Sequence, residues 1–164
     1  MVLSGWHLSH LPVRLVGRRR AVQTIDKVVV SWPELDLAGF LLRPRPFFIP
    51  FVPAQGKTRL TDTGLVLESL QSIERKSRRW RRDTLQAAAL YEKTPVYDSG
   101  NRLVGHVQDI AIDAAALQIT HLVVTRGVLG DLLHGALLIP RARVLSITPD
   151  KVKIHISREP LLLK

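Results

Sequence analysis

The spacing of hydrophobic positions in this 164-residue chain recurs after 82 residues. Nine apolar residues between Val22 and Leu42 fall opposite nine between Val104 and Val124, with the same irregular steps of three, three and two. Recurrent spacing of this kind is typical of repeated architecture, so the pattern predicts two tandem copies of one unit. The pairs are Val22 with Val104, Ile25 with Val107, Val28 with Ile110, Val30 with Ile112, Leu35 with Leu117, Leu37 with Ile119, Phe40 with Leu122, Leu41 with Val123 and Leu42 with Val124.

The second copy has the clearer strand pattern. Residues 151–156 alternate between polar and apolar, which predicts a half-exposed strand with Val152, Ile154 and Ile156 on its buried face. Residues 120–126 form another β-rich run, with Val123 expected in the core. The three-residue step from Val107 to Ile110 is typical of a β-bulge where a strand curls to close a barrel. Short strands and tight turns together predict a small antiparallel barrel or sandwich.

One region between the copies favours a helix. Residues 68–93 contain no glycine or proline and are rich in good helix formers. The sequence Asp83-Thr84-Leu85-Gln86 fits a capping box, and Pro95 ends the helix because the residue before a proline avoids the α region. We therefore expect a helical linker between the two units.

Short motifs in residues 94–156 resemble the PRC-barrel family, which is named for the H subunit of the photosynthetic reaction centre. They occur in the family's order: Pro95-Val96-Tyr97-Asp98, the Gly100 turn, Val104-Gly105-His106-Val107-Gln108-Asp109, Leu122-Val123-Val124, Leu138-Ile139-Pro140 and Val144-Leu145-Ser146-Ile147. The resemblance implies a six-stranded β-barrel that acts as an adaptor surface, on membrane photosystems or, in a ribosome maturation factor, on ribosomal protein. It implies no catalytic residues.

The first copy departs further from that pattern. No Tyr-Asp follows Pro12-Val13, arginines occupy the first turn, and a proline-rich segment at 43–53 replaces the expected glycine loop, with Ile49-Pro50 as the expected counterpart of Ile139-Pro140. The sequence thus predicts a mainly β protein with two tandem PRC-like barrels. The expected parts are a degenerate barrel at 1–70, a basic helical linker at 71–84 and a PRC-barrel domain at 85–164.

Composition narrows the class of protein. With 46% hydrophobic residues the chain can bury a core, and the lack of cysteine excludes disulfide scaffolds and thiolate chemistry. The N-terminus lacks the features of a secretory signal, and the most apolar stretch, 35–54, is interrupted by Arg43-Pro44-Arg45-Pro46. We expect a cytoplasmic protein without a transmembrane segment.

Catalytic and metal-binding patterns are weak. The six histidines form no paired motif, and Asp109 and Asp113 would be neighbours only on a helix, where the pattern predicts strand and turn. No dinucleotide-binding or Walker sequence occurs. The sequence predicts a protein that is not an enzyme and has no metal and no cofactor.

Charge points to an anionic partner. The formal net charge is +10, and residues 1–82 hold 15 basic and six acidic side chains, a net charge of +9. On a helix, the cluster at 75–82 would align arginines along one stripe suited to a phosphate backbone, while Trp80 could stack on an unpaired base. The alternative is a solvated helix that Trp80 anchors to a barrel. The candidate nucleic-acid-binding residues are Arg75, Lys76, Arg78, Arg79, Trp80, Arg81 and Arg82, with Arg18, Arg19 and Arg20.

The segment 43–53 combines four prolines with Phe47, Phe48 and Phe51. If exposed, these phenylalanines would form a docking patch for a protein partner, a second copy of the chain in a homodimer, or a membrane interface. If buried, they cap the barrel. The leading hypothesis is an adaptor for RNA or a ribonucleoprotein, and the alternative is a protein-protein or membrane-peripheral scaffold.

Overall fold

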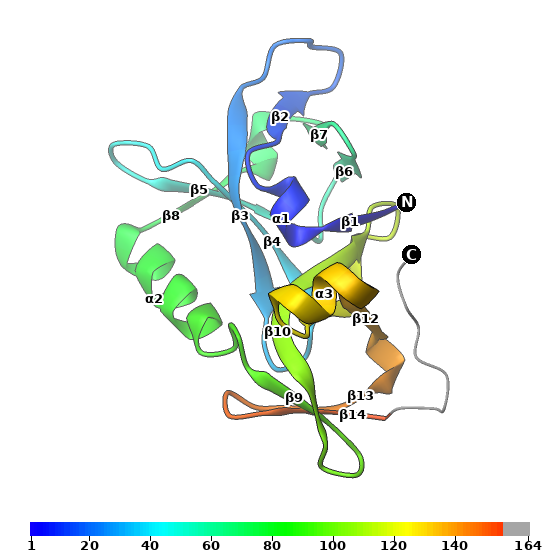
Figure 1. The fold of residues 1–164 in the computed structure, drawn as a ribbon. Helices are drawn as coiled ribbons and strands as arrows, with labels where there is room; N and C mark the ends of the chain where they lie inside the picture. Colours follow the sequence, from blue (N-terminus) through cyan, green and yellow to red (C-terminus); the bar gives the residue numbers. More distant parts are fainter. Residues whose placement is uncertain (156–164) are drawn as a thin grey trace.

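The structure, a computed structural model, describes residues 1–155 and is built mainly from two twisted sheets (Figure 1). The first sheet contains β2 (Pro12–Leu15), β3 (Gln23–Ser31), β4 (Asp36–Leu42), β5 (Ile49–Pro53), β6 (Thr58–Thr61), β7 (Gly64–Leu67) and β8 (Glu74–Lys76). The second contains β1 (Val2–Ser4), β9 (Pro95–Asp98), β10 (Leu103–Asp113), β11 (Gln118–Thr125), β12 (Leu137–Pro140), β13 (Val144–Ile147) and β14 (Val152–Ile154). The helices are α1 (Gly5–Leu8), α2 (Arg78–Ala89) and α3 (Val128–His134), with 3₁₀ turns at Leu70–Ser72 and Arg141–Arg143.

The two sheets share one strand order and one register. The order β5-β4-β3-β2-β7-β6 recurs as β12-β11-β10-β9-β14-β13, with a parallel pair, β2–β7 or β9–β14, in each. Ile25 pairs with Leu42 as Val107 pairs with Val124, and the bulges after Ile25 and Val107 also coincide. Bulges bend and twist strands, so the matched pair curls both sheets in the same way. The expectation of a mainly β fold with two barrel-like units joined by a basic helix is confirmed.

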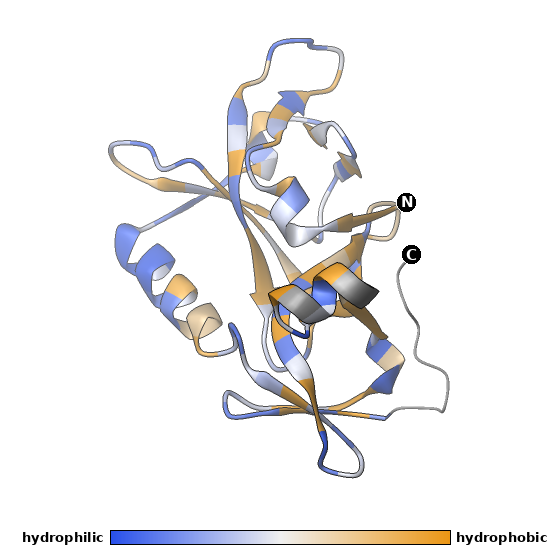
Figure 2. Ribbon diagram, in the orientation of Figure 1, coloured by the Kyte–Doolittle hydropathy of each residue, from blue (hydrophilic) through white to orange (hydrophobic). Residues whose placement is uncertain are grey.

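Most buried side chains of the two units form one continuous core. It includes Phe40 and Leu122, which occupy equivalent ladder positions and are both fully buried. Figure 2 shows the strands of both sheets rich in hydrophobic residues where they approach one another. Ile154 is fully buried as predicted, whereas Ile156 lies outside the described residues.

Two core expectations need correction. Val123 is half-buried because Leu122 and Val124, on either side of it, face the core and alternation turns Val123 outward. Val52-Pro53, rather than Ile49-Pro50, is the counterpart of Ile139-Pro140, since Phe40 pairs with Val52 as Leu122 pairs with Ile139.

The chain's N-terminus belongs to the second sheet. Val2 pairs with Asp113 and Leu3 with Ile112, so β1 extends a sheet that otherwise begins after α2. Two side-chain contacts also join the first unit to the second. Arg141 donates to Asp36 at 2.6 Å, and the Trp32 ring stacks on Tyr91 with centroids 5.1 Å apart. The two units are therefore joined at several points besides the linker.

The linker itself is only partly helical. Residues 74–76 form β8, which pairs with the edge strand β5, and α2 begins after Ser77, whose side chain accepts the Trp80 N–H. Asp83, expected at the helix start, lies in the second turn instead. Arg75 consequently lies on a strand and outside the helical stripe that the sequence predicted. None of the helices within residues 1–155 has the length and apolar composition needed to cross a bilayer.

Candidate nucleic-acid interface

The loop between β4 and β5 presents one phenylalanine to solvent. The Arg45 N–H donates to the Phe48 carbonyl at 2.9 Å and closes the tip of the loop, while Pro44 and Pro46 restrict the backbone on either side of Arg45. Phe47 at this tip is 96% exposed. The loop therefore holds an aromatic ring in water on a constrained backbone.

The other two phenylalanines of the segment are engaged within the protein. Phe48 is half-buried, with the Arg75 guanidinium 4.5 Å from its ring centroid. Phe51 is 7% exposed and packs with Leu41 and Ile49 on the outer face of the first sheet. Phe51 is therefore buried, as the alternative expectation had it. Of the three phenylalanines expected to form a docking patch, Phe47 is the one that is fully accessible.

Trp80 anchors α2 to the first sheet. Its ring meets Phe51 edge-on at 5.1 Å, and the Lys76 ammonium lies 5.1 Å from the indole. The side chain is half-buried among Val29 and Leu85 in the outer cluster. Because the Trp80 ring is used in this packing and the Lys76 ammonium lies against that ring, we leave both residues out of the candidate interface.

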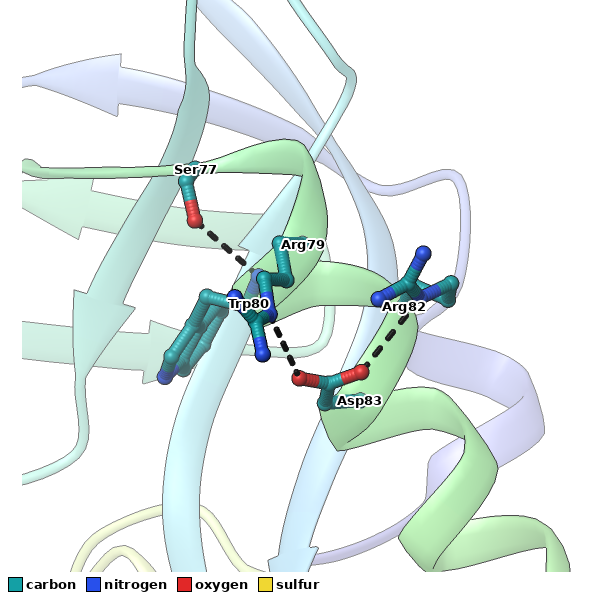
Figure 3. A network of polar contacts seen from close by, with 5 residues as sticks. All are labelled: Ser77, Arg79, Trp80, Arg82 and Asp83. Carbon is teal, nitrogen blue, oxygen red and sulfur yellow. Dashed lines mark hydrogen bonds and ion pairs between the residues drawn. The ribbon is translucent and has the colours of Figure 1, made fainter.

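The arginines of α2 divide into one structural residue and three exposed ones. Arg81 is partly buried and pairs with Asp26 on β3 at 2.9 Å. Arg79 and Arg82 converge on Asp83, at 3.8 and 3.3 Å (Figure 3). Exposed ion pairs of this kind contribute little, so both guanidinium groups remain available to a stronger anion.

Side-chain contacts connect the helix to the neighbouring loops. Arg78 donates to the Pro46 carbonyl at 3.3 Å, and Arg45 donates to the Val22 carbonyl at 3.5 Å. Val22 directly follows the exposed loop that holds Arg18, Arg19 and Arg20. These contacts place three arginine-rich segments in sequence across the first unit. We call the following exposed residues the basic face: Arg18, Arg19, Arg20, Arg43, Arg45, Arg75, Arg78, Arg79 and Arg82.

Arg43 and Arg45 belong to this face although the sequence assigned them to no nucleic-acid site. Both are exposed and belong to the loop that carries Phe47, and the Gln23 side chain donates to the Arg43 carbonyl at 3.4 Å. The alternation Arg-Pro-Arg-Pro ahead of two phenylalanines was the available signal. From the sequence, this segment predicted contact with a membrane or a protein partner, and its arginines were not assigned to RNA.

The second unit exposes two apolar side chains on one helix. Val128 and Leu132, one helical turn apart on α3, are 79% and 77% exposed. Asp131 beside them accepts hydrogen bonds from the Thr125 hydroxyl and from the Arg126 N–H, the latter at 3.0 Å. These bonds stabilise the carboxylate and lower the pKa of Asp131 below its ordinary value of 3.8. In residues 1–155, no three carboxylate or imidazole side chains gather as metal ligands would.

Comparison with known proteins concerns the second unit. Residues 87–160 match the family model of the PRC-barrel domain, a range that contains β9 through β14. The first unit lies outside the match. No curated protein matches the chain.

Proposed function

Residues 87–160 are a PRC-barrel domain, and on this premise we propose that the protein is a non-enzymatic adaptor that binds RNA or a ribonucleoprotein through the basic face of its first unit. The observation that carries the proposal is the contact series that runs from Arg78 through Pro46 and Arg45 to Val22. It connects a helix and two loops that each carry arginines, and so supports reading the separate clusters of the sequence as one surface.

Arginine suits a phosphate partner for physical reasons. Its planar guanidinium presents several N–H donors to phosphate oxygens, and it is more weakly hydrated than an ammonium. Each phosphate contact releases condensed counterions, which lowers the slope of log K against log salt by about 0.7 on single strands. A face with nine exposed arginines therefore favours strong, salt-dependent binding to a nucleic acid.

The uneven charge of the chain supports RNA binding by the first unit and a different partner for the second. Residues 1–82 have a net charge of +9, whereas residues 83–164 hold nine basic and eight acidic side chains, a net charge of +1. Electrostatic attraction would thus orient the first unit toward a polyanion. The PRC-barrel domain is left with its own surface for a second partner, which is what an adaptor requires.

A protein-protein scaffold is the second candidate function. Val128 and Leu132 favour it, because two large apolar side chains on one exposed helical turn are typical of a docking contact. In this proposal the partner is a protein that covers α3. Such binding would depend weakly on salt, unlike binding to a phosphate polymer.

The test compares two double variants with equal charge loss. Arg79→Gln with Arg82→Gln removes two members of the basic face whose recorded ion pairs are with exposed Asp83. Arg102→Gln with Lys151→Gln removes two exposed cations from the second unit. Fluorescence anisotropy with a labelled 20-nucleotide RNA should show a loss of roughly tenfold for the first variant and less than roughly twofold for the second. Equal losses of RNA affinity in the two variants, or no RNA binding by the wild-type protein at low salt, would overturn the proposal.

A further inference from the structure

We propose that Phe47 stacks on one unpaired base of a bound RNA, so that the basic face selects single strands over duplexes. This inference rests on the proposed function and specifies its substrate class. The ring, its loop and the surrounding charges each support it.

The loop holds Phe47 ready for stacking. Pro46 precedes it, and the Pro46 carbonyl accepts a hydrogen bond from Arg78 at 3.3 Å. Phe48 follows it, held beneath the Arg75 guanidinium. With both neighbours fixed and 96% of Phe47 exposed, the ring offers its faces to a ligand without a prior rearrangement.

The charges beside the ring suit the phosphates that flank a single base. Arg45 lies two residues before Phe47, and Arg75 and Arg78 contact the residues on either side of it. An aromatic platform within a track of cations is the arrangement by which proteins bind single strands, because every base has a π face and every nucleotide a phosphate.

A single exposed ring fits a base better than it fits a membrane or a duplex. Stable binding at a membrane interface scales with buried apolar area, and Phe48 and Phe51 are engaged within the protein. In a duplex the bases already stack on one another, so a ring can enter only by unstacking a step. An unpaired base is the ligand that accepts one aromatic face at no such cost.

The experiment substitutes Phe47 in three ways and measures binding to three probes. Phe47→Ala removes the side chain, Phe47→Leu keeps an apolar group without a π face, and Phe47→Trp keeps an aromatic one. The probes are a 20-nucleotide oligouridine, a blunt RNA duplex with the same number of phosphates, and vesicles containing phosphatidylserine. Leu70→Ala, at a leucine that is 59% exposed in the same unit, is the matched control.

We expect Phe47→Ala and Phe47→Leu to weaken oligouridine binding by about 5- to 150-fold, the range seen when stacking aromatics are removed. Phe47→Trp should retain affinity, and its indole fluorescence should be quenched as oligouridine binds. Duplex binding should change by less than twofold in all three variants. Circular dichroism melts should stay unchanged, because the ring has almost no contacts to lose.

The outcomes separate this inference from the proposed function. If Phe47→Ala leaves oligouridine binding intact while the Arg79 and Arg82 variant weakens both RNA forms, stacking is wrong and RNA binding stands. Failure of the wild-type protein to bind either RNA overturns both. Loss of vesicle binding in Phe47→Ala, with retention in Phe47→Leu, would assign the ring to a membrane instead.

Discussion

The indole of Trp80 meets the ring of Phe51 edge-on, with centroids 5.1 Å apart and planes inclined by 60°. This contact fastens α2 to the outer face of the first sheet. It also uses the aromatic residue that the sequence placed among six cations as a stacking candidate. An aromatic in a basic cluster is thus compatible with binding and with anchoring, and the two are distinguished by what the ring contacts.

Replacement of Trp80 should affect stability more than binding. We expect Trp80→Ala to lower the free energy of unfolding by about 2 to 4 kcal/mol, since it loses buried area and an edge-to-face contact. Urea melts measure this change. Trp6→Ala, at a residue that is 82% exposed, should cost less than about 0.5 kcal/mol. Equal costs for the two tryptophans would show that Trp80 does not anchor α2.

The coverage of the first sheet by α2 gives a second prediction. Leu41 and Val123 occupy equivalent positions in the two ladders, but Leu41 is fully buried in the cluster beneath α2 and Val123 is half-buried. Leu41→Ala should cost about 2 to 4 kcal/mol and Val123→Ala about 1 kcal/mol in urea melts. A larger cost at Val123 would contradict the packing of α2 on the first sheet.

The partly buried pair of Arg81 and Asp26 should be structural. Removal of one partner leaves the other poorly solvated, so Arg81→Gln and Asp26→Asn should each destabilise by about 1 to 3 kcal/mol. The double variant should cost less than the sum of the two single variants, because neither charge is then left alone. Additive costs in a double-mutant cycle would mean that the two side chains do not interact.

Asp83 should restrain the basic face. It draws Arg79 and Arg82 toward the helix surface, and its negative charge opposes a phosphate nearby. Asp83→Asn should therefore increase RNA affinity by roughly two- to tenfold and steepen its salt dependence, because more guanidinium charge is released to the ligand. Asp113→Asn, on the second unit, is the control and should leave affinity unchanged.

Asp131 should make the second unit sensitive to acid. Hydrogen bonds from Thr125 and the Arg126 N–H lower the pKa of Asp131 in the folded state. The stabilisation is therefore fully present above the unfolded-state value of 3.8 and is lost as pH falls through the lower folded-state pKa. Thr125→Val should move the pKa of Asp131 back toward 3.8, which carboxyl-carbon NMR titration measures. An unchanged pKa would remove the hydroxyl as its cause.

The equivalent core positions and bulges of the two units were predictable because apolar spacing is a local feature of the sequence. The pairing of Glu74–Lys76 with β5 could not be predicted, because it joins segments that are far apart in the sequence. This pairing overrides the helix preference of residues 68–76. Ser77 caps α2, where the sequence predicted Asp83, because strand β8 directly before Ser77 fixes where the helix starts. The run Leu122–Val124 is apolar throughout, so it contains no polar residue that would indicate which side chains face inward.

The candidate interface was predictable in composition and less so in geometry. Clustered arginines and their first-unit bias follow from the sequence alone. The link between Arg78 and Pro46, the burial of Arg81 and the isolation of Phe47 depend on long-range contacts. Those contacts decide which cations face solvent and which aromatic remains accessible.

The salt dependence of RNA binding by the wild-type protein is the decisive measurement for the proposed function. Anisotropy titrations of oligouridine from 50 to 300 mM salt should give a log–log slope of about −3 or steeper, corresponding to four or more phosphate contacts at about 0.7 each. A slope near zero, or the absence of binding at the lowest salt, would contradict an adaptor that holds RNA on its basic face.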